Sequence, residues 1–155
     1  MRALVLLVGF AISITGPANA LSCVRPDAAA LYIWAQESED VYQPVLAQID
    51  SPRQKPVETG APPDYRATVV GHSLTQDGFT KPISTTITVR SGCAGPWCGA
   101  ALDSGKTYLA VLRVAENDLI LDIGPCPFTA IAEPATAQIQ TFVNCAQGKT
   151  CRPMR

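Results

Sequence analysis

The sequence lacks the residue patterns of several common functional classes. Basic residues never form a run longer than two and are not interleaved with aromatic residues, so nothing predicts a nucleic-acid partner. The chain has one histidine, His72, and no Cys-x-x-Cys pair, and neither feature fits a zinc site. Beyond the N-terminus no apolar stretch approaches 18 residues, so no membrane span is expected in the mature chain. We therefore expect no metal, no cofactor and no nucleic acid.

The first twenty residues have the pattern of a secretory signal peptide. Arg2 precedes an apolar run at residues 4–14, and Ala18-Asn19-Ala20 fits the small-x-small cleavage rule. Cleavage after Ala20 would leave one domain, residues 21–155, with 11 basic and 13 acidic residues and a net charge of −2. A lipoprotein signal ending at Cys23 is the alternative, but Leu21 fits the residues before such a cysteine poorly. The expected location is extracytoplasmic, either secreted or periplasmic.

All six cysteines follow the signal peptide. An even number of cysteines in an exported chain predicts disulfides rather than a metal site, because the compartment is oxidising. Six cysteines allow 15 connectivities, and their spacing alone does not select one.

The pattern of apolar residues predicts five strands between two short helices. Asp27 is suited to cap a helix over residues 28–35, and Pro134 is suited to open a terminal amphipathic helix. The strands are expected at residues 41–49, 65–71, 83–90, 107–115 and 118–123. Residues 51–64 are expected to form a loop and residues 73–82 a turn-rich segment.

Three details of these strands can be tested against a structure. Pro44 predicts an edge or bulged strand, because proline cannot donate to a ladder. The alternation at residues 83–90 places Ile83, Thr85, Ile87 and Val89 on the core face. Asn117, between the last two strands, suits a left-handed turn position. Together the elements predict a mainly β fold, a five-stranded Greek-key barrel of the OB type with short flanking helices.

The chain resembles the netrin-like domain shared by tissue inhibitors of metalloproteinases (a TIMP-like domain). The matching pieces are the mature start Leu21-Ser22-Cys23-Val24-Arg25-Pro26, the Cys98-Gly99 step, the Gly105-Lys106-Thr107-Tyr108-Leu109 element, and Cys126 after a hairpin. The resemblance covers most of the mature chain and implies an OB-type barrel stapled by disulfides.

The resemblance also implies a disulfide pairing, with one departure. It implies a Cys23–Cys126 bridge. The inhibitors begin with a cysteine where this chain has Leu21, so the usual partner, Cys98, is left over. We expect Cys93 to replace it, giving Cys93–Cys98, and Cys145–Cys151 to complete the set.

The same resemblance implies a candidate function. In the inhibitors, the N-terminal amine and the first carbonyl chelate the zinc of a protease, and here these groups would belong to Leu21. The chain lacks the disulfide that would hold Leu21, and ordering a loose terminus costs affinity. We therefore expect a protein-binding module without catalysis, whose partner is unknown. Inhibition of an extracytoplasmic zinc protease is the alternative. The candidate binding rim consists of Leu21, Ser22, Val24, Arg25 and Trp97.

Trp97 has two interpretations. Packed beside a disulfide it would fill the core, which is the simpler interpretation, whereas exposed it would be an anchor for a partner. A third use is redox chemistry, because Trp97-Cys98-Gly99 matches part of a thioredoxin-like site. Such sites need a second cysteine three residues on, where this chain has Ala101, so the redox alternative is disfavoured.

Hydrolase chemistry has little support. His72, Ser73 and Asp77 could be written as a triad, but they lie at a turn and no Gly-x-Ser-x-Gly motif occurs. The carboxylates at residues 103, 116, 118 and 122 lie at strand ends, where solvated charges are the usual case. We predict no catalytic residues.

Overall fold

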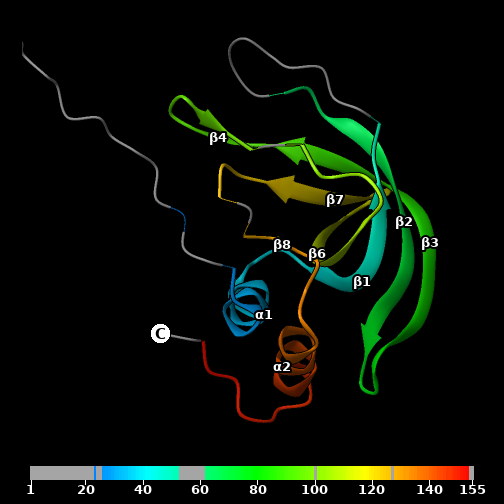
Figure 1. Ribbon diagram of the computed structural model, residues 1–155, viewed down its shortest axis with the longest axis vertical. Coiled ribbons are helices and arrows are strands. Elements are labelled where there is room, and N and C mark those ends of the chain that lie inside the picture. Colours follow the sequence, from blue (N-terminus) through cyan, green and yellow to red (C-terminus); the bar gives the residue numbers. More distant parts are fainter. Residues whose placement is uncertain (1–22, 24–25, 53–61, 100, 127, 154–155) are drawn as a thin grey trace, which may run out of the picture.

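The computed structural model describes residues 23, 26–52, 62–99, 101–126 and 128–153, and strands dominate them (Figure 1). This confirms the prediction of a mainly β fold with two short helices. The elements follow one another as α1 (Ala28–Glu37), β1 (Tyr42–Asp50), β2 (Tyr65–Thr75), β3 (Gly78–Ser91), β4 (Cys93–Ala94), β5 (Trp97–Cys98), β6 (Lys106–Ala115), β7 (Asp118–Ile123), β8 (Ala130–Ala132) and α2 (Thr136–Ala146).

One strongly curled sheet organises the chain. Its order is β1-β2-β3-β7-β6-β8, and β1 also pairs with β6, so the sheet curls back toward its first strand. All of its pairings are antiparallel except β3 with β7. The ladders on the side of β7 are short, with four residue pairs to β3 and three to β6. The sheet is therefore a partly open barrel with a sixth strand, β8, and not a closed barrel of five strands.

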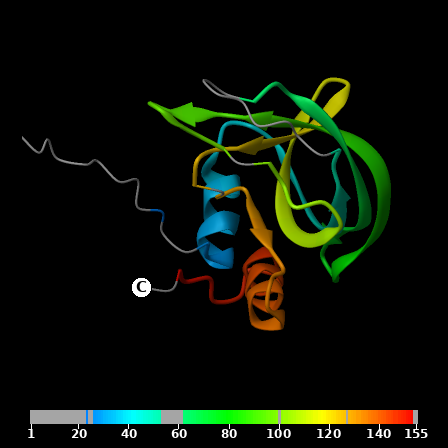
Figure 2. The ribbon, with the colours of Figure 1, turned by 45° about the horizontal axis from the view of Figure 1, so that its top comes forward.

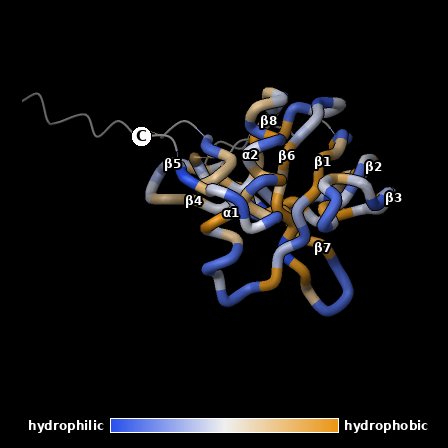
Figure 3. Tube along the Cα trace, turned by 90° about the horizontal axis from the view of Figure 1, so that it is seen from below, coloured by the Kyte–Doolittle hydropathy of each residue, from blue (hydrophilic) through white to orange (hydrophobic). Residues whose placement is uncertain are grey.

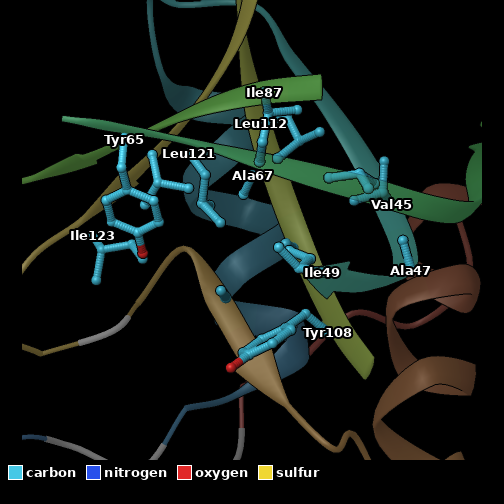
Figure 4. Close-up of a cluster of buried hydrophobic side chains, with 14 residues drawn as sticks. Val45, Ala47, Ile49, Tyr65, Ala67, Ile87, Tyr108, Leu112, Leu121 and Ile123 are labelled. Atoms are coloured by element: carbon cyan, nitrogen blue, oxygen red, sulfur yellow. The ribbon is translucent and has the colours of Figure 1, made fainter. Parts of the chain in front are cut away.

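The inside of the curled sheet holds the main core. Figure 4 shows Val45, Ile49, Ile87 and Leu112, which come from β1, β3 and β6 and are fully buried. Ile87 and Val89 lie on the buried face as the alternation of β3 predicted, while Ile83 is only partly buried. Alternating burial of this kind leaves the other face of each strand to solvent.

Two core tyrosines fix the segment that leads into β6. The backbone N–H of Leu102 donates to the hydroxyl of Tyr65 at 3.2 Å. The hydroxyl of Tyr108 accepts from the N–H of Asp103 at 3.0 Å and donates to its carbonyl at 3.2 Å. Both rings are buried, and burial raises the pKa of each phenol. Buried polar groups of this kind need partners, and the loop supplies them.

The two helices pack together against the sheet (Figures 1 and 2). Leu31 of α1 and Phe142 of α2 are fully buried in a second cluster with Leu109, Val111 and Ile131. In Figure 3 the apolar segments meet in the middle of the molecule and polar loops surround them. Asp27 caps α1 as predicted, because its carboxylate accepts from the N–H of Ala30 at 2.8 Å.

An ion pair ties β2 to the start of β7 on the outer face. Arg66 donates to Asp118 at 2.8 Å and to the hydroxyl of Thr88 at 2.7 Å, and Thr88 also donates to Asp118. Burial alone would raise the pKa of Asp118. The hydrogen bond from Thr88 and the charge of Arg66 outweigh it, so the pKa lies below its usual value.

Three disulfides staple the fold: Cys23–Cys126, Cys93–Cys98 and Cys145–Cys151. These are the pairs that the resemblance implied. Their presence is consistent with an extracytoplasmic location. Within the described ranges, no helix is long and apolar enough to cross a membrane. The expected signal peptide, residues 1–20, lies outside the described residues.

The structure corrects the predicted edge strand. β1 is not at an edge, because it pairs with β2 on one side and β6 on the other. Pro44 lies opposite Val111 of β6, and the ladder to β2 begins one residue later, at Val45. The proline is therefore tolerated because it lies in the part of β1 that has a neighbour on one side only.

Two turn predictions also differ from the structure. Most of residues 73–82 is strand, because β2 and β3 form a long hairpin that turns only at Gln76 and Asp77. Gly78 follows that turn with a φ of 101°. Asn117 is not left-handed: among the described residues other than glycine, only Glu133 has a positive φ. The hairpin between β6 and β7 therefore forms without the conformation that Asn117 was expected to supply.

Candidate binding surface

A small hairpin projects from the end of β3. β4 and β5 pair through Cys93 and Cys98, which also form a disulfide, and Gly95 makes the turn with a φ of 59°. The base of the hairpin is fixed by the backbone. Gly92 donates to the carbonyl of Ile123 at 2.8 Å, and Gly99 donates to the carbonyl of Gly92 at 2.9 Å. The hairpin is thus anchored to the end of β7.

Gly99 is required at that base for steric reasons. A Cβ atom at Gly99 would lie 2.9 Å from the carbonyl carbon of Ile123 and closer still to its oxygen. Real Cβ atoms essentially never come so close to backbone. The Cys98-Gly99 step therefore has a structural explanation, the close passage of two backbone segments.

Trp97 is exposed at the hairpin. Its exposed fraction is 47%, so the simpler interpretation, that it fills the core, is wrong. Trp97 belongs to β5, next to the disulfide, and lies opposite Ala94. A large aromatic residue on a cross-linked hairpin offers contact area with little conformational entropy to lose on binding.

The rest of the predicted rim is described only at Cys23. Leu21, Ser22, Val24 and Arg25 lie outside the described residues. Cys23 is bonded to Cys126, in the segment after β7, and the backbone of Ile123 in β7 contacts the base of the hairpin.

Between these elements is a hollow of about 370 Å³, here called the aromatic hollow. Its apolar walls are the rings of Trp34 in α1, Tyr42 in β1 and Phe128 after β7. The Trp34 ring lies 5.0 Å from that of Tyr42 and 5.5 Å from that of Phe128, measured between centroids. Gly92 and Cys126 also border it, so it touches both the hairpin base and the N-terminal disulfide.

Two charged residues, Arg90 and Asp122, line the aromatic hollow, and each is in an ion pair. Arg113 donates to Asp122 at 2.9 and 3.4 Å, and its Nε lies 3.9 Å from Asp40. Arg90 pairs with Asp64 at 3.4 Å. The hydrogen bond to Asp122 raises the pKa of Arg113. Both guanidinium groups therefore have carboxylate partners.

The same charges affect the pKa of Tyr42. Burial raises the pKa of its phenol, a hydrogen bond with Ser38 lowers it, and Asp40 and Asp122 raise it further. The positive charge of Arg113 opposes these carboxylates. The pKa of Tyr42 is raised in total, so the phenol is neutral at physiological pH.

The structure does not assemble the alternative catalytic groups. His72 is exposed on β2, while its neighbour Ser73 is buried and donates to the carbonyl of Lys81 at 3.3 Å. Consecutive strand residues face opposite ways, so these two side chains do not meet. The six cysteines are all in disulfides. In the described part of the chain, no three potential metal ligands cluster.

Sequence reasoning missed most of the aromatic hollow. It gave no binding role to Trp34, Tyr42 or Phe128. Trp34 and Tyr42 lie in different elements, and Phe128 follows far along the chain, so no local pattern joins all three. The only available clue was the scarcity of aromatic residues, at 6% of the chain, which makes three adjoining rings unusual.

Comparisons with models of known protein families, with curated proteins and with solved structures find no match to this chain. The site must therefore be interpreted from its own geometry.

Proposed function

We propose that this protein is an exported, non-catalytic module that binds another protein. Its contact surface would be the binding face, formed by the Cys93–Cys98 hairpin, the aromatic hollow and the N-terminal segment held by Cys23–Cys126. The observation that carries the proposal is the exposed Trp97 on a hairpin whose base, at Gly92, borders a hollow with three aromatic walls. Tryptophan and tyrosine dominate the residues that contribute most to protein interfaces, so this grouping favours binding over a purely structural role.

A site-specific cross-linking experiment tests this proposal. A photoreactive phenylalanine analogue replaces Trp97 in one variant and Val70 in a control. Val70 is similarly exposed, at 51%, but lies on β2 away from the hairpin. We expect a discrete cross-linked protein from position 97 only, reduced by an excess of unlabelled wild type but not of Trp97→Ala. Equal or absent cross-linking from both positions would contradict the proposed binding face.

Membership of the netrin-like family remains part of the proposal. The partly open barrel, the two packed helices and the Cys23–Cys126 bridge support it. Export through cleavage after Ala20 is also proposed, supported by the three disulfides. Sequencing the N-terminus of the exported protein checks it, and a start at Leu21 is expected.

Inhibition of an extracytoplasmic zinc protease is the second candidate function. One observation favours it: the Cys23–Cys126 bridge anchors the chain two residues after Leu21, whose amine and carbonyl would be the zinc ligands. The test compares protein beginning at Leu21 with protein carrying one additional alanine before it. Inhibition by the first and not by the second supports this function. Zinc endopeptidases that stay fully active at micromolar protein would eliminate it.

A further inference from the structure

We propose that the open edge of β3 binds an extended peptide segment of another protein, which adds to the sheet as a further strand. This site goes beyond the proposed function, since its described lining shares no residue with that of the aromatic hollow. Three features of the molecule support it: the uncovered stretch of β3, the direction of the backbone groups along it, and a cavity beside it.

The edge of β3 that faces away from β2 is covered only in part. β7 pairs with it from Thr88 onward, so the residues before Thr88 have no strand beside them on that side within the described residues. No side chain between Lys81 and Arg90 is charged, and Ser84 and Thr86 are exposed. Charged side chains are a common protection of sheet edges, so an uncharged exposed stretch is suited to accept another strand.

The backbone groups of Ser84 and Thr86 point to this open edge. The N–H of Gly92, just after β3, donates to the carbonyl of Ile123 in β7 at 2.8 Å. Every second residue of a strand directs its N–H and C=O to the same edge, and β3 pairs with β2 without a register shift over this stretch, so Ser84 and Thr86 face the side of β7 too. The guanidinium of Arg66, which pairs with the start of β7, also donates to the carbonyl of Thr86 at 3.4 Å.

A cavity of about 630 Å³ lies along the open edge. Its lining includes Thr85 and Thr86 of β3 together with Val114 and Leu119 of the β6–β7 hairpin, so it lies between β3 and that hairpin. Val114 is 44% exposed and offers an apolar contact there. The volume is within the range of ligand pockets. The gap of the partly open barrel is therefore wide enough to hold a ligand beside β3.

The chemistry of the edge favours a peptide over other ligands. An extended peptide carries N–H and C=O groups at the spacing of a strand, so it can pair with both Ser84 and Thr86. A small apolar molecule would contact Val114 but would displace water from these backbone groups without replacing its hydrogen bonds, which is unfavourable. A second copy pairing through the same edge would bring its own β6–β7 hairpin against this one, because the hairpin borders the cavity in each copy.

The site is bounded at both ends. Pro82 faces the same edge as Ser84 but has no N–H, so it interrupts a ladder on that side. At the other end, β7 occupies the edge from Thr88. A bound peptide would therefore pair with residues 83–87, and its hydrogen bonds would be made to the N–H and C=O groups of Ser84 and Thr86.

The test is an NMR titration of the intact, isotope-labelled protein. The probe is an acetylated and amidated five-residue peptide of alternating valine and threonine. The same peptide methylated at every backbone nitrogen is the matched control, because it keeps its side chains but cannot donate. Octanoate is the apolar control that is not a peptide. We expect saturable, millimolar binding of the first probe only, with the amide signals of Ser84 and Thr86 moving most and the indole signal of Trp97 stationary.

Matched variants then locate the binding. Thr86→Pro removes the outward N–H without removing a hydrogen bond to β2, and it should weaken peptide binding about 3- to 10-fold, the effect of one hydrogen bond. Thr86→Val keeps that N–H and should change binding by less than about 2-fold. Circular dichroism shows whether each variant is folded, and the methylated peptide decides on the wild type if Thr86→Pro is not.

Four results would overturn the inference. They are no saturable binding, equal binding of the methylated peptide, binding of octanoate that moves the same amide signals, and equal weakening by Thr86→Pro and Thr86→Val. Sedimentation of the protein without peptide tests the remaining occupant. Self-association that Thr86→Pro abolishes would make a second copy of this chain the occupant, and it would also overturn the inference.

Discussion

Removing the Cys23–Cys126 disulfide should destabilise the protein more than removing either of the other two. In the loop-entropy description, a cross-link stabilises by restricting the unfolded chain, and its effect grows with the enclosed loop. Cys23 and Cys126 are 103 residues apart, whereas the other pairs are 5 and 6 residues apart. The long bridge should contribute about 4.7 kcal/mol and each short one about 2 kcal/mol.

The comparison uses paired substitutions, so that no free thiol remains. For a domain of this size, 1 kcal/mol corresponds to about 3–5 °C in Tm. Cys23→Ser/Cys126→Ser should therefore lower Tm by about 14–24 °C, and Cys93→Ser/Cys98→Ser by about 6–10 °C. Thermal and urea unfolding followed by circular dichroism, without reductant, measure both. The slope of the unfolding free energy against urea concentration should be larger for Cys23→Ser/Cys126→Ser than for the wild type, because the unfolded chain without this cross-link exposes more surface.

Two results would refute this reasoning. One is a loss of Tm in Cys93→Ser/Cys98→Ser that equals or exceeds that of Cys23→Ser/Cys126→Ser. The other is a large loss in the latter variant with an unchanged urea dependence, which would place the effect in the folded state instead of the unfolded chain.

Three further predictions concern stability. Gly99→Ala should cost about 3 kcal/mol in urea unfolding because its Cβ would meet backbone, whereas Gly92→Ala, whose nearest contact would be 3.9 Å away, should cost less than half as much. Asp27→Ala should lose about 1 kcal/mol and Asp27→Asn much less, since asparagine also caps a helix; equal losses would exclude the cap as the cause. Asp118 has a lowered pKa, so its stabilisation is complete above its ordinary pKa, near 4, and is lost as the pH falls through the folded value. Asp118→Asn should therefore destabilise the protein at pH 7 and much less at pH 2, and a loss of equal size at both pH values would contradict this.

Local patterns predicted the elements that local chemistry controls. The cap at Asp27, the alternation in β3 and the amphipathic helix containing Phe142 each depend on residues close together in the chain. The edge prediction at Pro44 was wrong because it treated one proline as a property of the whole strand. In the structure that proline lies near the start of β1, before its first β2 partner, where a missing donor costs little.

The candidate site was predicted only in part, for a physical reason. The Cys93–Cys98 link was expected only from the family resemblance, which left Cys98 without its usual partner, and the structure has that link. The aromatic hollow depends on α1, β1 and the segment after β7 converging in space, and on Trp97 lying outside the core. Neither follows from periodicity, since exposure of a tryptophan depends on where the hairpin is fixed.

The way the β4–β5 hairpin is fixed to the sheet has a consequence for engineering its sequence. Its two ends, Gly92 and Gly99, are fixed by backbone hydrogen bonds, which do not depend on the side chains between them. Of the six residues in between, five are exposed and Cys98 is partly exposed, so none of them belongs to the core. Residues 93–98 can therefore be exchanged as a cassette: new recognition sequences closed by the same cysteine pair should fold on an unchanged scaffold, as the variable loops of a binding library do.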